Sequence, residues 1–179
     1  MRYNDTEREI SYIAIALAAI FWILSIAWMI TIFVFSSESG IESTTRSFSI
    51  LQYFKNLGLE FINETVIRKG AHVGEFALLA FLSFMAVRYT NMISPSTSYS
   101  QTPVKIIKSD NEMYIAISFW ICAVYSAIDE YHQLFVTGRN GSIYDFLIDM
   151  CGAVIVLLII RVAFSINLRR HGLSELRYD

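Results

Sequence analysis

The sequence has little net charge, few cysteines and no internal repeat, and each of these absences is informative. It holds 14 Lys and Arg against 16 Asp and Glu, a formal net charge of −2, which excludes a strongly basic nucleic-acid-binding surface. No segment repeats, and nothing marks a second domain. The two cysteines, Cys122 and Cys151, lie in apolar stretches. A free cysteine there usually serves as a small apolar side chain, so neither indicates a redox compartment.

Charge is also missing from long stretches of the chain. Residues Ile10 to Phe35 form a run of 26 without one charged side chain, whereas about 20 apolar residues suffice to cross roughly 30 Å of hydrocarbon. The run is too long for the core of a signal peptide, usually about 7–15 residues, and no small-residue cleavage pattern follows it. It therefore predicts a retained transmembrane helix.

Three further apolar stretches predict three more spans. The four expected spans cover about residues 10–35, 71–89, 113–132 and 143–164. The third apolar stretch is the shortest, so its helix is expected to continue through Asp129 to His132. The predicted fold is all-α, an integral membrane bundle of four transmembrane helices that forms one domain over residues 1–179.

The connections between the spans differ in character. Residues 36–70 are too many for a simple turn, and apolar side chains recur there at near-helical spacing, at Phe48, Leu51, Phe54, Leu57, Phe61 and Ile62. They predict a helix in the membrane interface, with a helix packed on the core or on a partner as the alternative. Residues 91–111 hold both prolines and many Ser and Thr, which predicts a loop.

The distribution of Lys and Arg predicts the orientation in the membrane. Nine lie before the first span, between the second and third, or after the fourth, and five lie in the other two loops. Because cytoplasmic loops carry the excess of Lys and Arg, both termini are expected inside the cell and the other two loops outside.

Ionisable side chains lie at or just inside the ends of the apolar stretches. Such a group is costly in a bilayer, so it predicts a functional site with a partner nearby. In VIRKGAHVGEF, Lys69, His72 and Glu75 recur every three residues and share one broad side of a helix. Two structural alternatives stay open, because Lys69 can snorkel to the interface and His72 can hydrogen-bond a neighbouring helix.

A second group of polar residues ends the third span, in SAIDEYHQLF. Asp129, His132 and Gln133 share one helical face, while Glu130 points about 100° away. A carboxylate beside a histidine can orient the imidazole as a general base or supply two metal ligands. For Glu130, a solvated charge at a capped helix end is the stronger interpretation.

The fourth span opens with VTGRNGSIYDFLIDMCGA. Ser142 and Asp145 have the spacing of a capping box, which gives Asp145 a structural explanation. Asp149 lies one turn deeper in apolar sequence, where a carboxylate needs Arg139, Lys69, a metal ion or a proton as its partner.

Two further observations tie these groups together. Gly152 and Ala153 follow Asp149, and their small side chains allow a neighbouring helix to approach closely. On the predicted topology, the polar ends of all four spans meet at the outer face. The sequence therefore predicts one shared site there.

The polar strings resemble those of the VanZ-like family of bacterial membrane proteins. The resemblance covers FVFSSESG from Phe33, KGAHVGEFALL from Lys69, DEYHQLF from Asp129 and GRNGSIYDFLIDMCG from Gly138. The family usually has Gln where this chain has Glu38, and often Pro where it has Thr137. Matching polar positions are Ser36, Ser37, Lys69, His72, Glu75, Asp129, Glu130, His132, Gln133, Arg139, Ser142, Asp145 and Asp149.

The resemblance implies a small helical protein in the plasma membrane of Gram-positive and related bacteria. The name-giving member of the family is associated with resistance to the glycopeptide antibiotic teicoplanin. The family does not settle a biochemical activity, the oligomeric state, or whether each member confers resistance.

Three hypotheses from different classes follow. The first is an enzyme at the outer leaflet that acts on an amphiphilic envelope molecule, such as a lipid-linked precursor or a lipoglycopeptide. Its expected roles are catalysis by Asp129, His132, Lys69 and Arg139, substrate binding by Ser36, Ser37, Glu130, Gln133 and Ser142, and divalent-metal binding by His72, Glu75, Asp145 and Asp149. The second is a binding protein in which the same charges shape a pocket without turnover. The third is a transporter subunit, for which no broken helices or inverted repeat are visible.

Overall fold

The computed structural model describes residues 11–93 and 103–175, which form helices and no strand. The five helices are α1 (Tyr12–Ser36), α2 (Gly40–Asn56), α3 (Glu64–Asn91), α4 (Pro103–Gln133) and α5 (Ile143–Glu175). Four segments are long and apolar enough to cross a membrane, namely α1, α3, Asn111–Gln133 of α4 and Ile143–Asn167 of α5. The predicted all-α fold with four candidate spans is confirmed.

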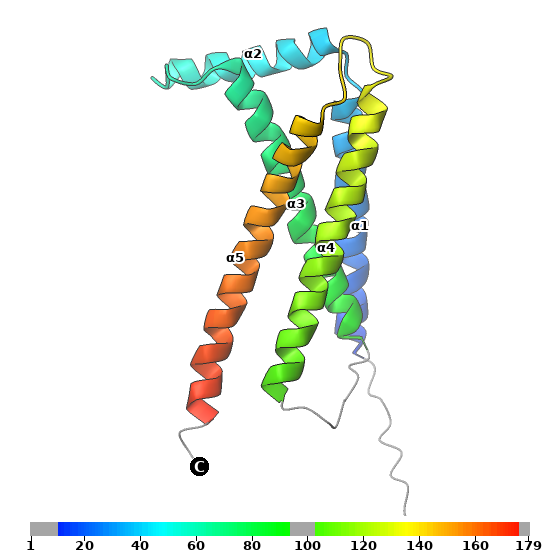
Figure 1. Ribbon diagram of the computed structural model, residues 1–179, viewed down its shortest axis with the longest axis vertical. Helices are drawn as coiled ribbons and strands as arrows, with labels where there is room; N and C mark the ends of the chain where they lie inside the picture. Colours follow the sequence, from blue (N-terminus) through cyan, green and yellow to red (C-terminus); the bar gives the residue numbers. More distant parts are fainter. Residues whose placement is uncertain (1–10, 94–102, 176–179) are drawn as a thin grey trace, which may run out of the picture.

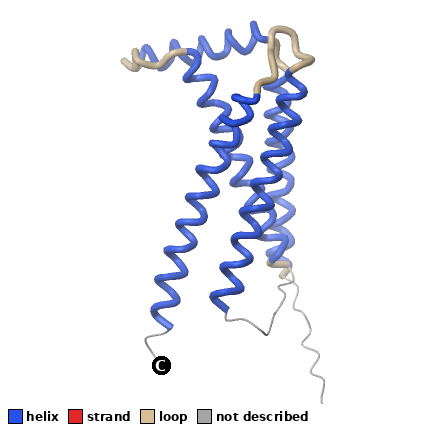
Figure 2. Tube along the Cα trace, in the orientation of Figure 1, coloured by secondary structure: helices blue, strands red, loops and turns tan. Residues whose placement is uncertain are grey.

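The four long helices run alongside one another, and α2 lies across one end of the bundle (Figure 1). At that end α1 and α4 finish and α3 and α5 begin, so we call it the α2 end. The connections from α1 to α2, from α2 to α3 and from α4 to α5 also gather there (Figure 2). The first residues of α1 and the last of α5 both lie toward the opposite end (Figure 1).

The first loop forms a helix, as its periodicity predicts. Leu51 is buried against the bundle, whereas Phe48 and Phe61 are exposed. A capping box starts α2, because the Ser39 hydroxyl accepts from the backbone N–H of Glu42 and the Glu42 carboxylate accepts from that of Ser39. The Ser39 hydroxyl also donates to the Glu42 carboxylate at 2.8 Å. This bond first, and then the one from the Ser39 backbone N–H, lowers the pKa of Glu42.

Two helix boundaries differ from the prediction. The α4 helix begins at Pro103, so the last part of the predicted 91–111 loop is helical, while residues 94–102 lie outside the described part of the chain. Proline is well suited to a first helical position, where its missing N–H is not needed. The α3 helix begins at Glu64, seven residues before its apolar stretch, with the Asn63 side chain accepting from the backbone N–H of Val66 at 2.9 Å.

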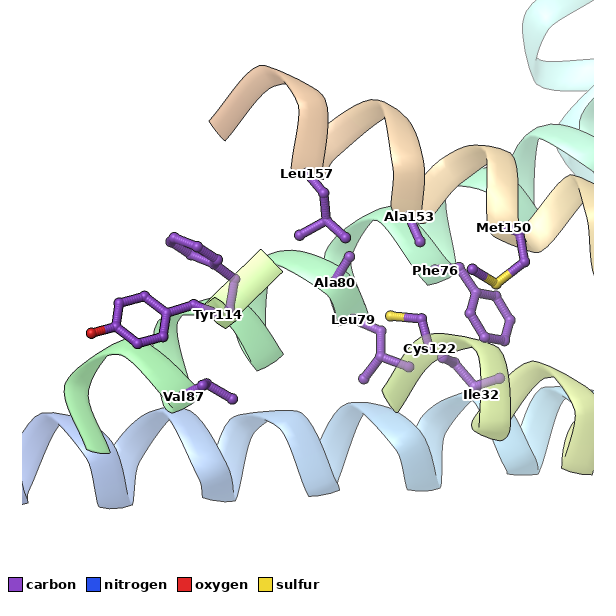
Figure 3. Close-up of a cluster of buried hydrophobic side chains, with 11 residues drawn as sticks. Ile32, Phe76, Leu79, Ala80, Val87, Tyr114, Cys122, Met150, Ala153 and Leu157 are labelled. Carbon is purple, nitrogen blue, oxygen red and sulfur yellow. The ribbon is translucent and has the colours of Figure 1, made fainter. Parts of the chain in front are cut away.

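A buried apolar cluster fills the middle of the bundle (Figure 3). Its members come from all four long helices and include Ile32, Phe76, Leu79, Ala80, Cys122, Met150, Ala153 and Leu157. At Gly152 the α5 backbone touches α3, because an added Cβ would collide with the carbonyl oxygen of Val73. The close approach predicted from Gly152 and Ala153 is therefore present.

Candidate functional site

Two adjoining cavities lie at the α2 end. The larger has a volume of about 560 Å³ and is bounded by the start of α2, the start of α3 and the α4–α5 loop. Its polar lining includes Ser43, Thr44, Arg68, His72, Gln133, Arg139, Asn140 and Asp145. The smaller, of about 40 Å³, lies toward the core and adds Ser36, Arg46, Glu75 and Asp129 to the residues it shares with the larger one.

His72 and Asp149 form the imidazole–carboxylate contact of the site. His72 Nδ1 lies 3.4 Å from Asp149 Oδ1 and 3.7 Å from Glu75 Oε2. Asp149 is fully buried, and its Oδ2 accepts a hydrogen bond from Ser126 Oγ at 2.7 Å. The partners of Asp149 are therefore His72 and Ser126, whereas the sequence predicted Arg139, Lys69, a metal ion or a proton. Ser126 was not predicted as a site residue, although it lies three residues before Asp129 and so near the same face of α4.

Arg139 closes the C-terminal end of α1. Its Nε donates to the carbonyl oxygen of Glu38 at 2.9 Å and its Nη2 to that of Phe35 at 3.0 Å. Phe35 lies in the last turn of α1, where backbone carbonyls lack intrahelical partners, and Glu38 follows directly after the C-cap residue Ser37. Burial of the guanidinium lowers the pKa of Arg139. Arg139 thus fixes the α4–α5 loop against α1 and also borders both cavities.

Glu38 and Arg46 extend this arrangement at the end of α1. Arg46 pairs with the Glu38 carboxylate at 2.6 Å and lies 4.4 Å above the ring of Phe35. Position 38, where the family usually has Gln, therefore carries a carboxylate that is bound to an arginine of α2.

Arg68, rather than Lys69, borders the cavities. Arg68 lines both of them, whereas Lys69 is exposed and lines neither. Within the described part of the chain, Arg68 makes no hydrogen bond or ion pair with another side chain. The sequence carries a signal for this, because Arg68, His72 and Glu75 have i, i+4, i+7 spacing and lie within about 60° of one another around the helix.

The structure does not bring Asp129 and His132 into contact. Asp129 is buried and its Oδ2 accepts from Gln133 Nε2 at 2.9 Å, while its Oδ1 has no hydrogen-bond partner among the described residues. His132 turns toward α1, with Nε2 3.1 Å from Ser37 Oγ and its ring centroid 4.5 Å from that of Phe33. Of these groups, Asp129 borders the smaller cavity and Gln133 the larger.

Glu130 and Ser142 join the end of α4 to the start of α5. The Ser142 backbone N–H donates to Glu130 Oε2 at 2.7 Å, and the Ser142 hydroxyl accepts from the N–H of Tyr144 at 3.2 Å. The predicted capping box of Ser142 with Asp145 is wrong, because Glu130 takes the N–H that Asp145 was expected to bind. The prediction that Glu130 is solvated is also wrong, since Glu130 is buried.

The expected metal ligands are only partly gathered. His72, Glu75 and Asp149 lie close together, and Asp145 lines the larger cavity. Among the described residues, no three His, Cys, Asp or Glu side chains are arranged to hold a metal ion. A bound divalent metal therefore stays a prediction.

Ser36 borders the smaller cavity, and its buried hydroxyl has no hydrogen-bond partner among the described residues.

Comparison with known proteins gives one match. A family model described as VanZ/LLP1 matches residues 21–164, a range that contains every residue lining the two cavities. No curated protein and no solved structure matches the chain.

Proposed function

The chain belongs to the VanZ/LLP1 family, and from that premise we propose that it binds or acts on an amphiphilic cell-envelope molecule through the larger cavity. We further propose a link to glycopeptide resistance of the teicoplanin type. The observation that supports this best is a polar cavity of about 560 Å³, bordered by two arginines, at one end of a bundle of candidate membrane spans. A cavity in that place can accept a polar headgroup while the apolar part of the same molecule stays in the bilayer.

The charges around the cavity favour an anionic headgroup. Arg68 has no partner within the described chain, and Arg139 uses Nε and Nη2 on α1, which leaves Nη1 for a ligand. Guanidinium groups bind phosphate and carboxylate in a forked geometry. Gln133 and Asn140 add neutral amide groups to the same wall. A lipid-linked envelope precursor and an acylated glycopeptide both carry such a headgroup beside an apolar tail.

An enzyme with this site would rely on His72. Its imidazole borders both cavities, and its Nδ1 lies 3.4 Å from Asp149, whose other oxygen accepts a hydrogen bond from Ser126. A carboxylate behind an imidazole fixes the orientation of the ring, which is what general acid–base chemistry requires. Asp129 and Glu75 stand at the smaller cavity next to it.

A binding protein without turnover is the second candidate. It is favoured by the number of polar groups at this end that already engage one another. Arg46 pairs with Glu38, Glu130 binds the Ser142 backbone, and Arg139 binds carbonyls of α1. Such a network shapes a pocket rather than performing a reaction.

Antibiotic susceptibility of bacteria that express the full chain tests the site. The comparison uses wild type, Arg68→Gln and Lys69→Gln, with Lys55→Gln in the exposed last turn of α2 as the control for charge. We expect wild type and Lys55→Gln to raise the teicoplanin inhibitory concentration equally and Arg68→Gln to lose that protection, at matched membrane levels and melting temperatures. If protection is lost in Lys69→Gln but kept in Arg68→Gln, the functional site does not lie in the larger cavity. Absence of protection by wild type would end the resistance proposal.

Turnover distinguishes the two candidates. Purified wild type and Asp149→Asn are incubated with radiolabelled envelope lipids, and products are separated by chromatography. An enzyme gives a product in the wild type and none in Asp149→Asn, although both retain the lipid. A binding protein retains the lipid and gives no product in either case.

A further inference from the structure

A third cleft opens between α4 and α5 near the opposite end of the bundle. Its volume is about 370 Å³. It is lined by Glu112 of α4 and by Arg161, Val162, Ser165, Ile166 and Arg169 of α5. It shares no residue with the cavities at the α2 end.

The two arginines of this cleft differ in how far other side chains bind them. Arg161 Nε donates to Glu112 Oε1 at 2.8 Å, which leaves both Nη groups of Arg161 available. Arg169 is exposed and makes no hydrogen bond or ion pair within the described part of the chain. Among the described residues, the lining of the cleft therefore holds two guanidinium groups against one carboxylate, an excess of positive charge.

The residues of α5 in the cleft form one stripe along the helix. Arg161, Ser165 and Arg169 recur every four residues, and Val162 and Ile166 follow the same spacing beside them. Residues four apart lie one above the other on a helix. Two guanidinium groups thus flank a single groove whose wall is partly apolar.

The depth of the cleft matches a lipid headgroup. Glu112 is the second residue of the α4 span, and the α5 span ends at Asn167, between Arg161 and Arg169. At about 1.5 Å per residue, Arg161 lies roughly 9 Å inside that limit and Arg169 about 3 Å beyond it. An arginine at such a depth extends its head toward the interface. Both guanidinium groups then reach the layer in which lipid phosphates lie.

We propose that this cleft binds the phosphodiester headgroup of an anionic phospholipid from the adjacent leaflet. Arg169 and the Nη groups of Arg161 donate to the phosphate oxygens, and Val162 and Ile166 contact the first methylenes of an acyl chain. Glu112 holds the guanidinium of Arg161 in place. This site is separate from the larger cavity and does not depend on the function proposed for it.

Native mass spectrometry of the full-length protein in zwitterionic detergent tests the site. The probes are phosphatidylglycerol and phosphatidylcholine with the same acyl chains, and the signal is the number of lipids retained. Wild type is compared with Arg169→Gln and Arg170→Gln. Arg170 is the next residue of α5, is also exposed and lines none of the described cavities, so the two variants change the net charge equally.

We expect wild type to retain phosphatidylglycerol about tenfold better than phosphatidylcholine, because an ionic headgroup gains charge-assisted hydrogen bonds. Arg169→Gln abolishes this preference and Arg170→Gln keeps it. Glu112→Gln keeps the preference or strengthens it, since it removes the one carboxylate that the described residues contribute to the lining of the cleft. Equal losses in the two arginine variants would show attraction by net charge and overturn the proposal.

A competition experiment separates the lipid from a soluble anion. Inorganic phosphate is added to the wild type with bound phosphatidylglycerol, and sodium chloride of equal ionic strength serves as the control. If the site binds a lipid, phosphate releases no more phosphatidylglycerol than chloride does. Inorganic phosphate has no acyl chain, so it cannot replace the contacts of the lipid with Val162 and Ile166. Release that is specific to phosphate would show a soluble-anion site and overturn the proposal.

Discussion

The middle of the bundle and its α2 end are held together by different interactions. In the middle, small residues such as Gly152 and Ala153 let helices touch along their backbones, around a core of apolar side chains. At the α2 end, Arg139 and Glu130 hydrogen-bond the backbone of other elements. Because lipid is as apolar as a leucine side chain, helix packing in a membrane depends on shape and on polar bonds. Close packing predominates in the middle, where Trp28 Nε1 also donates to the carbonyl oxygen of Glu75 at 2.8 Å, and polar bonds predominate at the α2 end.

The polar groups at the α2 end are of two kinds: some hold the fold together, and others are free for a ligand. Polar groups with partners at the α2 end, such as the Glu130 carboxylate, connect elements to one another. Others border the smaller cavity and have no hydrogen-bond partner among the described residues, as is the case for Ser36 Oγ and Asp129 Oδ1. Stability and ligand binding should therefore respond to different substitutions at the same end.

The largest loss of stability is expected in the middle of the bundle. In Gly152→Ala the added Cβ meets the carbonyl oxygen of Val73, so α5 and α3 must separate. We expect a loss of about 3 kcal/mol, the upper part of the range for overpacking. Gly74→Ala is the matched control, since a Cβ there meets nothing within 4 Å. Unfolding in detergent measures both, and equal effects would refute the close approach.

A smaller loss is expected when the end of α1 loses its donors. Arg139→Gln leaves the carbonyl oxygens of Phe35 and Glu38 without their side-chain partner, which costs about 2 kcal/mol. Arg68→Gln removes the same charge from the same cavities but breaks no bond within the described chain, so its stability should equal that of the wild type. Thermal melting of the two purified variants measures the difference. If both lose equal stability, Arg139 does not close α1.

The junction of α4 and α5 is expected to contribute somewhat less. Glu130→Ala leaves the Ser142 N–H without its acceptor, at a cost of about 1.5 kcal/mol. Glu130→Gln keeps a carbonyl oxygen in the same place and should recover most of that loss. Melting temperatures of the pair test this, and a destabilised Gln variant would mean that the negative charge itself is needed.

The smallest effect is expected at the exposed start of α2. Ser39→Ala removes the N-cap and should cost about 1 kcal/mol. The pKa of Glu42 is lowered by its bonds to Ser39, so its contribution is present above the ordinary carboxyl pKa and is lost as the pH falls through the lowered value. The stability difference between wild type and Ser39→Ala should therefore narrow in acid. A difference that is constant with pH would exclude the hydrogen bond from the Ser39 hydroxyl to the Glu42 carboxylate.

The fold was predictable because its signals are local. The length of each apolar run places the four spans, and the spacing of Phe48, Leu51 and Phe54 indicates the helix across the end. The start of α4 was missed because the polar residues around it resemble a loop, although a proline commonly begins a helix.

The site was only partly predictable because it depends on the rotation of each helix. Successive residues differ by about 100° around a helix, which decides whether Arg68 or Lys69 borders a cavity. The pairing of Glu130 with Ser142 and of His72 with Asp149 joins different helices. No spacing within one segment reports such contacts.

The bonds between Arg139 and α1 also have a consequence for biosynthesis. The carbonyl oxygens of Glu38 and Phe35 precede Arg139 by 101 and 104 residues. The Gly40 N–H, which starts α2, likewise finds its acceptor in the carbonyl of Thr137. On the ribosome, α1 and α2 are therefore made long before the groups that join them to each other through the α4–α5 loop. The α2 end takes its final form only after translation has passed that loop, which makes the pocket one of the last parts of the protein to mature.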